Sequence, residues 1–193
     1  MNDADIRLAL INWLKQKKIP PQKILNEISI SDGLARPDLI AIYSYSHCYE
    51  IKGDNDQIQR IVKQFTHYQS SFKKNTLVTT QKHLKKALEL LPDFWGILVA
   101  INDKETVKFR YVRKSSHNPF YRRDIASKIL WKTEMQQLLE NKDINFRSNS
   151  TRNDLIDLIN TSYTSYELDQ SICLSLLNNL SSMKYFSFLA SFG

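Results

Sequence analysis

The sequence predicts an α/β fold for its first part and helices alone for its last part. Over residues 1–114, short apolar runs rich in β-branched residues alternate with amphipathic helical patterns, as in chains that form a sheet flanked by helices. Beyond a loop of turn-prone residues at 115–119, only helical periodicity remains. We therefore expect a core at 1–114, large enough to bury an apolar interior, and a helical region at 115–193.

Periodicity and breaker residues set the expected order of elements. In the first helix, Ile6, Leu10 and Leu14 recur at helical spacing, Asp3 or Asp5 can cap its start, and Pro20 lies beyond its end. The elements expected in the core are a helix at 3–18, strands at 24–30, 38–42 and 49–52, a helix at 57–73, a strand at 76–80, a helix at 84–91 and strands at 94–101 and 107–112. Helices are expected at 121–141, 151–159 and 166–183 in the remainder, the second of them opening on a capping box.

Cysteine content and hydropathy indicate the compartment. Cys48 and Cys173 lie far apart and form no Cys-x-x-Cys pair, so the sequence offers neither a zinc knuckle nor an iron–sulfur cage. They are expected to be buried thiols in a reducing compartment. The acidic start differs from a secretory signal, and no apolar run reaches bilayer length. We expect a cytoplasmic protein without a membrane partner.

One basic segment accounts for the charge of the whole chain. The formal net charge is +7, and residues 104–132 hold nine basic residues against two acidic ones, interleaved with aromatic residues. Cations for phosphates and rings for bases suit a nucleic-acid groove, so DNA is the expected partner. The alternative is a solvated face with rings buried at alternate positions. The candidate nucleic-acid-binding residues are Arg110, Arg113, Lys114, Arg122 and Arg123.

A short carboxylate motif lies at the centre of the core. Pro37-Asp38 leads into one short strand, and Glu50-Ile51-Lys52 ends the next, with a polar interruption of hairpin length between them. Hairpin pairing would bring Asp38 beside Glu50, while Glu50 and Lys52 would share a face. Two carboxylates at one sheet edge can hold a hard divalent cation. The plainer alternative is a turn aspartate and a same-face ion pair.

Two further features accompany the motif. Gln64 and Tyr68 form a Gln-x-x-x-Tyr pattern one turn apart on the following helix, and Glu27 precedes the aspartate. Together these residues resemble the PD-(D/E)XK restriction-endonuclease-like superfamily, RecB-type branch, over about residues 1–102. The resemblance implies a restriction-endonuclease-like mixed central sheet flanked by helices.

The resemblance also implies a metal-dependent nuclease acting on phosphodiester bonds, as a Mg²⁺-dependent deoxyribonuclease. Asp38, Glu50 and the Ile51 carbonyl would hold Mg²⁺, for which Mn²⁺ would substitute, and Lys52 would orient or deprotonate a water. Gln64, Tyr68 and Glu27 would complete the catalytic set, by positioning the phosphodiester and by helping to hold a second ion. Strand preference, mode of cleavage and biological pathway do not follow from the resemblance.

Two other functions compete with a nuclease. The chain could be a catalytically inactive, nuclease-fold protein that binds nucleic acid, or an interaction module in which Lys52 forms a structural ion pair. The C-terminal helices faintly resemble small SAP-type DNA-binding modules, and otherwise they would cap the core. The apolar tail at 185–189 would dock on the core or form a homodimer.

Overall fold

A six-stranded mixed sheet forms the centre of the protein. The computed structural model describes residues 1–104 and 106–178. The strands are β1 Lys23–Asn26, β2 Leu39–Ile42, β3 Ser46–Lys52, β4 Lys74–Thr80, β5 Gly96–Asp103 and β6 Thr106–Arg113, and they lie in the sheet in that order. The β3–β4 and β4–β5 pairs are parallel, and the other three pairs are antiparallel. The expected mixed central sheet flanked by helices is therefore confirmed.

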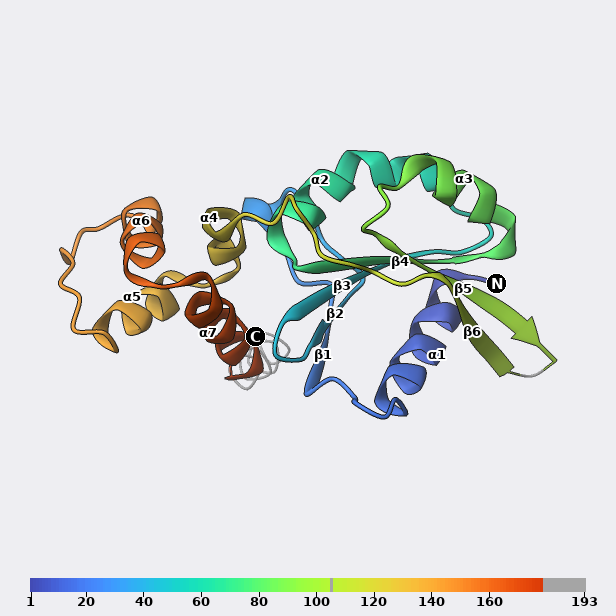
Figure 1. Ribbon diagram of the computed structural model, residues 1–193, viewed down its shortest axis with the longest axis horizontal. Coiled ribbons are helices and arrows are strands. Elements are labelled where there is room, and N and C mark those ends of the chain that lie inside the picture. The colour runs from blue at the N-terminus through green and yellow to red at the C-terminus, as the bar shows by residue number, and fades with distance from the viewer. Residues whose placement is uncertain (105, 179–193) are drawn as a thin grey trace, which may run out of the picture.

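Helices cover both faces of this sheet (Figure 1). Helix α1, Asp3–Lys15, packs on one face, and helices α2, Ile61–Ser71, and α3, Leu84–Leu90, lie over the other. Two apolar clusters fill the layers, because alternate strand residues point to opposite faces. Leu10, Leu39 and Ile51 belong to the α1 side, and Ile40 and Leu77 belong to the α2 side. Short 3₁₀ turns at Ser31–Gly33, Ile58–Arg60 and Gln81–His83 connect the elements.

The hairpin of β2 and β3 forms as its sequence predicts, with Leu39 opposite Tyr49. Several caps and bounds differ from expectation, two of them near the site. The cap of α1 is Asn2, whose side chain accepts a hydrogen bond from the Asp5 amide at 2.8 Å, instead of Asp3 or Asp5. Strand β1 ends at Asn26, because Glu27 adopts a left-handed backbone conformation with φ of 51°.

The helical region gathers at one side of the molecule, with α7 beside the β1–β2 part of the sheet (Figure 1). Its elements are α4 Arg123–Ala126, a 3₁₀ turn at Ser127–Ile129, α5 Lys132–Glu140, α6 Arg152–Ser162 and α7 Ser165–Asn178.

The prediction of one helix over 121–141 is wrong. Leu130 and Trp131 are extended, and the Glu134 side chain accepts a hydrogen bond from the Trp131 amide to start α5 afresh. The capping box of Thr151 and Asp154 at α6 is confirmed. The end of the helix expected to reach residue 183, and the apolar tail, lie outside the described residues.

Cys48 and Cys173 are free and buried, as expected. Among the described residues, none of the helices combines the length and apolar character that a membrane span requires.

Candidate functional site

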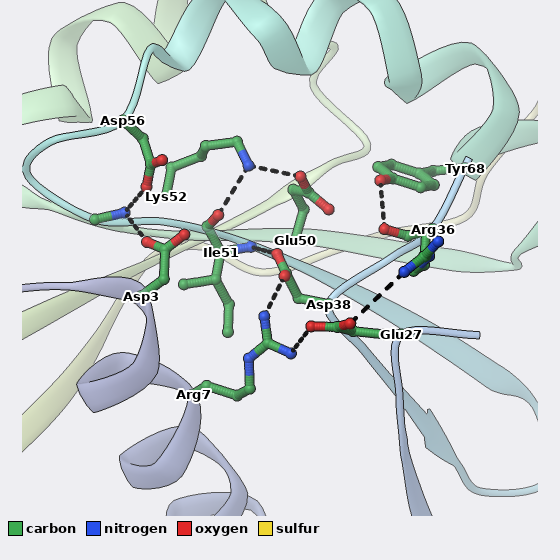
Figure 2. A network of polar contacts seen from close by, with 11 residues as sticks. Asp3, Arg7, Glu27, Arg36, Asp38, Glu50, Ile51, Lys52, Asp56 and Tyr68 are labelled. Carbon is green, nitrogen blue, oxygen red and sulfur yellow. Dashed lines mark hydrogen bonds and ion pairs between the residues drawn. The ribbon is translucent and has the colours of Figure 1, made fainter. Parts of the chain in front are cut away.

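The hairpin brings the predicted residues to one end of the sheet. Asp38 directly precedes β2, and the register that pairs Leu39 with Tyr49 sets Asp38 against Glu50. Lys52 ends β3 on the same face as Glu50, the face that α2 covers. Figure 2 shows these side chains together with Arg7 from α1, which lies on the opposite face of the sheet.

Glu50 and Lys52 form a buried ion pair. The Lys52 ammonium donates to Glu50 Oε1 at 2.7 Å and to the Ile51 carbonyl at 3.0 Å. The Glu50 side chain is only 4 % exposed, and its second oxygen, Oε2, has no hydrogen-bond partner in the described part of the chain. Burial raises the pKa of Glu50 to about 7, although the Lys52 cation opposes the shift. Burial lowers the pKa of Lys52, but Glu50, with help from Asp38 and Asp56, outweighs this and the net direction is upward.

Asp38 faces a different set of partners. Its Oδ1 accepts from the Arg7 guanidinium at 2.6 Å, and its Oδ2 accepts from the Ile51 amide at 2.7 Å. Burial raises the pKa of Asp38, while the Ile51 amide, Lys52 and Arg7 counteract it. Asp38 therefore ties α1 to the end of β3, instead of lining the cavity that Glu50 and Lys52 share (Figure 2).

That cavity holds about 250 Å³ and opens beside the start of α2. Gln64 and Asp56, which lies in the connection between β3 and α2, both line this cavity. Tyr68, one turn further along α2, is buried instead, and its hydroxyl donates to the Arg36 carbonyl at 3.2 Å. The two residues of the Gln-x-x-x-Tyr pattern thus differ in exposure, although both lie close to Glu50.

Glu27 belongs to the α1 side of this network. Its carboxylate accepts from Arg7 at 2.7 Å and lies 3.8 Å from the Arg36 guanidinium. Arg7 therefore joins two of the three acidic side chains that the sequence offered as metal ligands, Glu27 and Asp38 (Figure 2). A protein cation already compensates their charge.

Most of the expected magnesium ligands already have hydrogen-bond partners within the protein. Both oxygens of Asp38 and the Ile51 carbonyl accept hydrogen bonds from the protein, so of the proposed donors Glu50 Oε2 alone has none. Mg²⁺ keeps several waters but needs carboxylate oxygens that are free to bind it, and Arg7 and the Ile51 amide already engage those of Asp38. Among the described residues, no group of three or more His, Cys, Asp or Glu side chains could hold a metal ion. The Mg²⁺ and Mn²⁺ expectation stays a prediction.

The five candidate nucleic-acid-binding residues divide into two kinds. Arg113 donates hydrogen bonds to the Trp95 and Pro92 carbonyls, and Arg123 donates to the Tyr163 carbonyl. Both arginines therefore stabilise the fold. The others are exposed: Arg122 pairs with Asp124, and Arg110 and Lys114 have no ion pair within the described ranges. A contact of Arg110 or Arg122 with nucleic acid stays a prediction.

The charge of Lys114 acts on Lys17, a lysine outside the set of candidates that the sequence offered. Lys17, just beyond α1, has its ammonium 3.2 Å above the Trp13 ring and 5.8 Å from the Tyr111 ring. Burial lowers the pKa of Lys17, and the neighbouring Lys114 cation lowers it further. The two like charges are therefore close enough to repel each other.

Tyrosine rings continue this surface toward the β2–β3 turn. Tyr43 and Tyr45 stack with ring centroids 5.4 Å apart, and Lys74 lies 4.9 Å above the Tyr45 ring. The Tyr45 side chain is also close enough to Tyr111 to raise its pKa, after the larger effect of burial. We call this set the tyrosine–lysine surface: Lys17, Tyr43, Tyr45, Lys74, Tyr111 and Lys114.

The tyrosine–lysine surface lies at the opposite end of the strands from Glu50 and Lys52. Strand β3 runs from Ser46, beside the tyrosines, to Lys52, and α1 runs back from Asp3, beside Gly53, toward Lys17. The only sequence signals for this surface were the Lys15–Lys18 run and the aromatic residues among the basic ones in 104–132. Neither signal reveals that the two segments meet in space.

Comparisons with known proteins give the family. The family model described as bacteriophage P4 protein cII matches residues 1–187. Protein cII of Enterobacteria phage P4 is 24% identical over 179 residues, which cover 92% of this chain and 67% of that protein. A solved structure of a protein of unknown function from Silicibacter pomeroyi aligns with a TM-score of 0.48 at 14% identity, covering 78% of this chain and 98% of the other.

These matches overturn the resemblance to the PD-(D/E)XK superfamily. The family model spans nearly the whole chain and leads to cII, so the assignment to a nuclease family is wrong. The nuclease function, the Mg²⁺-dependent deoxyribonuclease activity and the inactive nuclease-fold alternative are wrong with it. The physical reason is that a few motif residues also arise as ordinary structural contacts: Asp38 bridges to Arg7, and Glu50 pairs with Lys52. On the match over residues 1–187, this chain belongs to the bacteriophage P4 cII protein family.

Proposed function

We propose that this protein binds DNA through its phosphate backbone at the tyrosine–lysine surface. One observation carries the proposal: Lys17 and Lys74 lie against tyrosine rings, Lys114 lies near Lys17, and in the described part of the chain no ion pair joins these lysines to a carboxylate. Neighbouring cations without an internal anion gain most from an external polyanion.

The chemistry of this surface supports a nucleic-acid partner over other anions. Lysine ammonium groups neutralise phosphates and release condensed counterions, which gives affinity without sequence choice. The tyrosine rings offer flat, amphipathic faces against which sugars and bases pack. The net charge of +7 adds long-range attraction to any such partner.

The Glu50–Lys52 cavity carries charges of both signs, which supports excluding it from the proposed DNA-binding surface. Its cations, Lys52, Arg60 and Lys63, share the cavity with Glu50 and Asp56, so a phosphate there would meet carboxylates as well as cations. We propose that the Glu50–Lys52 pair is structural. The homodimer expected through the C-terminal tail concerns residues outside the described ranges and stays a prediction.

Neutralising two of the lysines tests the proposal. Lys17→Gln combined with Lys114→Gln should weaken binding of a labelled duplex at least about tenfold at low salt, because two phosphate contacts lose their charge. The slope of log affinity against log salt should fall in magnitude by about 2, as expected for two lost phosphate contacts. Fluorescence anisotropy over a salt series measures both quantities.

The matched control changes the same net charge on the opposite face of the sheet. Lys63 and Lys85 are exposed on α2 and α3, and Lys63→Gln with Lys85→Gln should retain affinity to within about threefold, because only long-range attraction changes. Equal losses in the two double variants, or no duplex binding by the unchanged protein at low salt, would refute the proposal.

A further inference from the structure

A second cavity adjoins the tyrosine–lysine surface. Its volume is about 420 Å³. It lies between the β2–β3 turn, the start of β4 and helix α7, at the boundary between the sheet and the helical region. Tyr45 and Lys74 line it and also belong to the tyrosine–lysine surface. A DNA strand bound to the tyrosine–lysine surface could therefore extend directly into the cavity.

Buried polar groups fix the inner wall of this cavity. Asp169, 5 % exposed, accepts from the Tyr121 hydroxyl at 2.5 Å and forms an ion pair with Lys73. Asn118, 3 % exposed, donates to the carbonyls of Gln69 and Phe72, both at 2.7 Å. These groups are held by the protein itself, so the wall is shaped in advance and its own charges are balanced.

Two groups at the rim remain available. Because Asp169 compensates Lys73, the lysine left to meet an anion is Lys74, for which the described residues provide no carboxylate. Tyr166 on α7 also lines the cavity; the residue is 72% exposed, and its ring stacks on no other aromatic ring within the described ranges. A large ring held open to solvent beside a cation suits a flat ligand that carries a negative charge.

We propose that this cavity accepts one nucleotide of a single strand, with its base stacked on Tyr166 and its phosphate paired with Lys74. The volume lies within the range of small-ligand sites, and one flat base with its sugar is a ligand of that class. A base inside a duplex is stacked and paired on both sides, so entry requires an unpaired strand. The inference rests on the proposed DNA binding and adds a preference for single strands to it.

Removal of the Tyr166 ring tests this site in the full-length protein. Fluorescence anisotropy with a short labelled oligothymidylate and with a duplex of equal length compares the unchanged protein, Tyr166→Ala and Tyr166→Phe. Tyr166→Ala should weaken oligothymidylate binding about tenfold, the usual scale for one lost base stack, and change duplex binding less than about twofold. Tyr166→Phe should retain both affinities, because the ring remains.

An exposed aromatic residue that does not line the cavity supplies the control. Trp131, 59% exposed at the start of α5, can be replaced by alanine to remove a similar ring, and both affinities should stay unchanged. If Tyr166→Ala binds both probes as the unchanged protein does, or weakens both equally, the nucleotide site is overturned while DNA binding stands. If the unchanged protein binds neither probe at low salt, DNA binding fails and the nucleotide site fails with it.

Discussion

Replacing Lys52 with methionine should destabilise the folded protein by about 3–5 kcal/mol above pH 7, where Glu50 is ionised. Methionine keeps most of the apolar stem and removes the ammonium group, so the change isolates the loss of charge. Glu50 would then carry a charge at 4 % exposure, without the cation that lies 2.7 Å away in the unchanged protein. Urea unfolding followed by circular dichroism measures the difference in unfolding free energy.

Two further variants distinguish the cost of leaving Glu50 without its partner from the cost of removing the whole ion pair. Adding Glu50→Leu to Lys52→Met should restore most of the stability, because an apolar pair of similar volume leaves no buried charge. Lys86→Met, which breaks the exposed pair with Glu89, should cost less than about 1 kcal/mol. A cost for Lys52→Met no larger than that for Lys86→Met would contradict the structural role of the buried pair.

The stability of the protein should fall as pH rises from 4.5 to about 7, through the titration of Glu50. Its pKa rises from an ordinary 4.5 to about 7 in the folded state, so over this range the folded protein keeps a proton that the unfolded chain has lost. The folded state binds more protons, and a higher pH therefore favours unfolding. This contribution is fully present below pH 4.5, is lost as pH rises to about 7, and amounts to about 3 kcal/mol.

Comparison with Glu50→Gln isolates this contribution from other titrating groups. Asp3, whose pKa is raised to about 6 mainly by burial, acts in the same direction but is common to both proteins. The difference in unfolding free energy between the two proteins should therefore change by about 3 kcal/mol across the range, and become constant above pH 7. Parallel pH profiles for the two proteins would show that Glu50 titrates normally.

Local patterns in the sequence predicted much of the fold. The polar interruption at residues 44–46 and the apolar runs around it predicted the β2–β3 hairpin, which forms with Leu39 opposite Tyr49. The Thr151 capping box likewise marked the start of α6. Such features depend on neighbouring residues, whose spacing can be taken directly from the chain. The break at Leu130 was missed because the apolar spacing continues across it, although Glu134 offered a start signal three residues after Trp131.

Contacts between distant segments explain what the sequence did not predict. The hairpin correctly placed Asp38 beside Glu50, but Arg7, from another element, determines where the Asp38 carboxylate points. The charges of Lys17 and Lys114 influence each other only because α1 packs against β6, a contact that no local pattern encodes. Arg113 and Arg123 counted toward the basic segment in the sequence, yet the fold uses both to bind backbone carbonyls.

Cross-link mapping of a bound strand tests most directly whether DNA lies on the tyrosine–lysine surface. A bromouracil-substituted oligonucleotide is irradiated with the protein in EDTA, and the attachment sites are identified by mass spectrometry. We predict attachment at Tyr45 and Tyr111, and at Tyr166 when the strand is single. Attachment confined to residues 57–64, beside Glu50 and Lys52 at the other end of the sheet, would contradict this location.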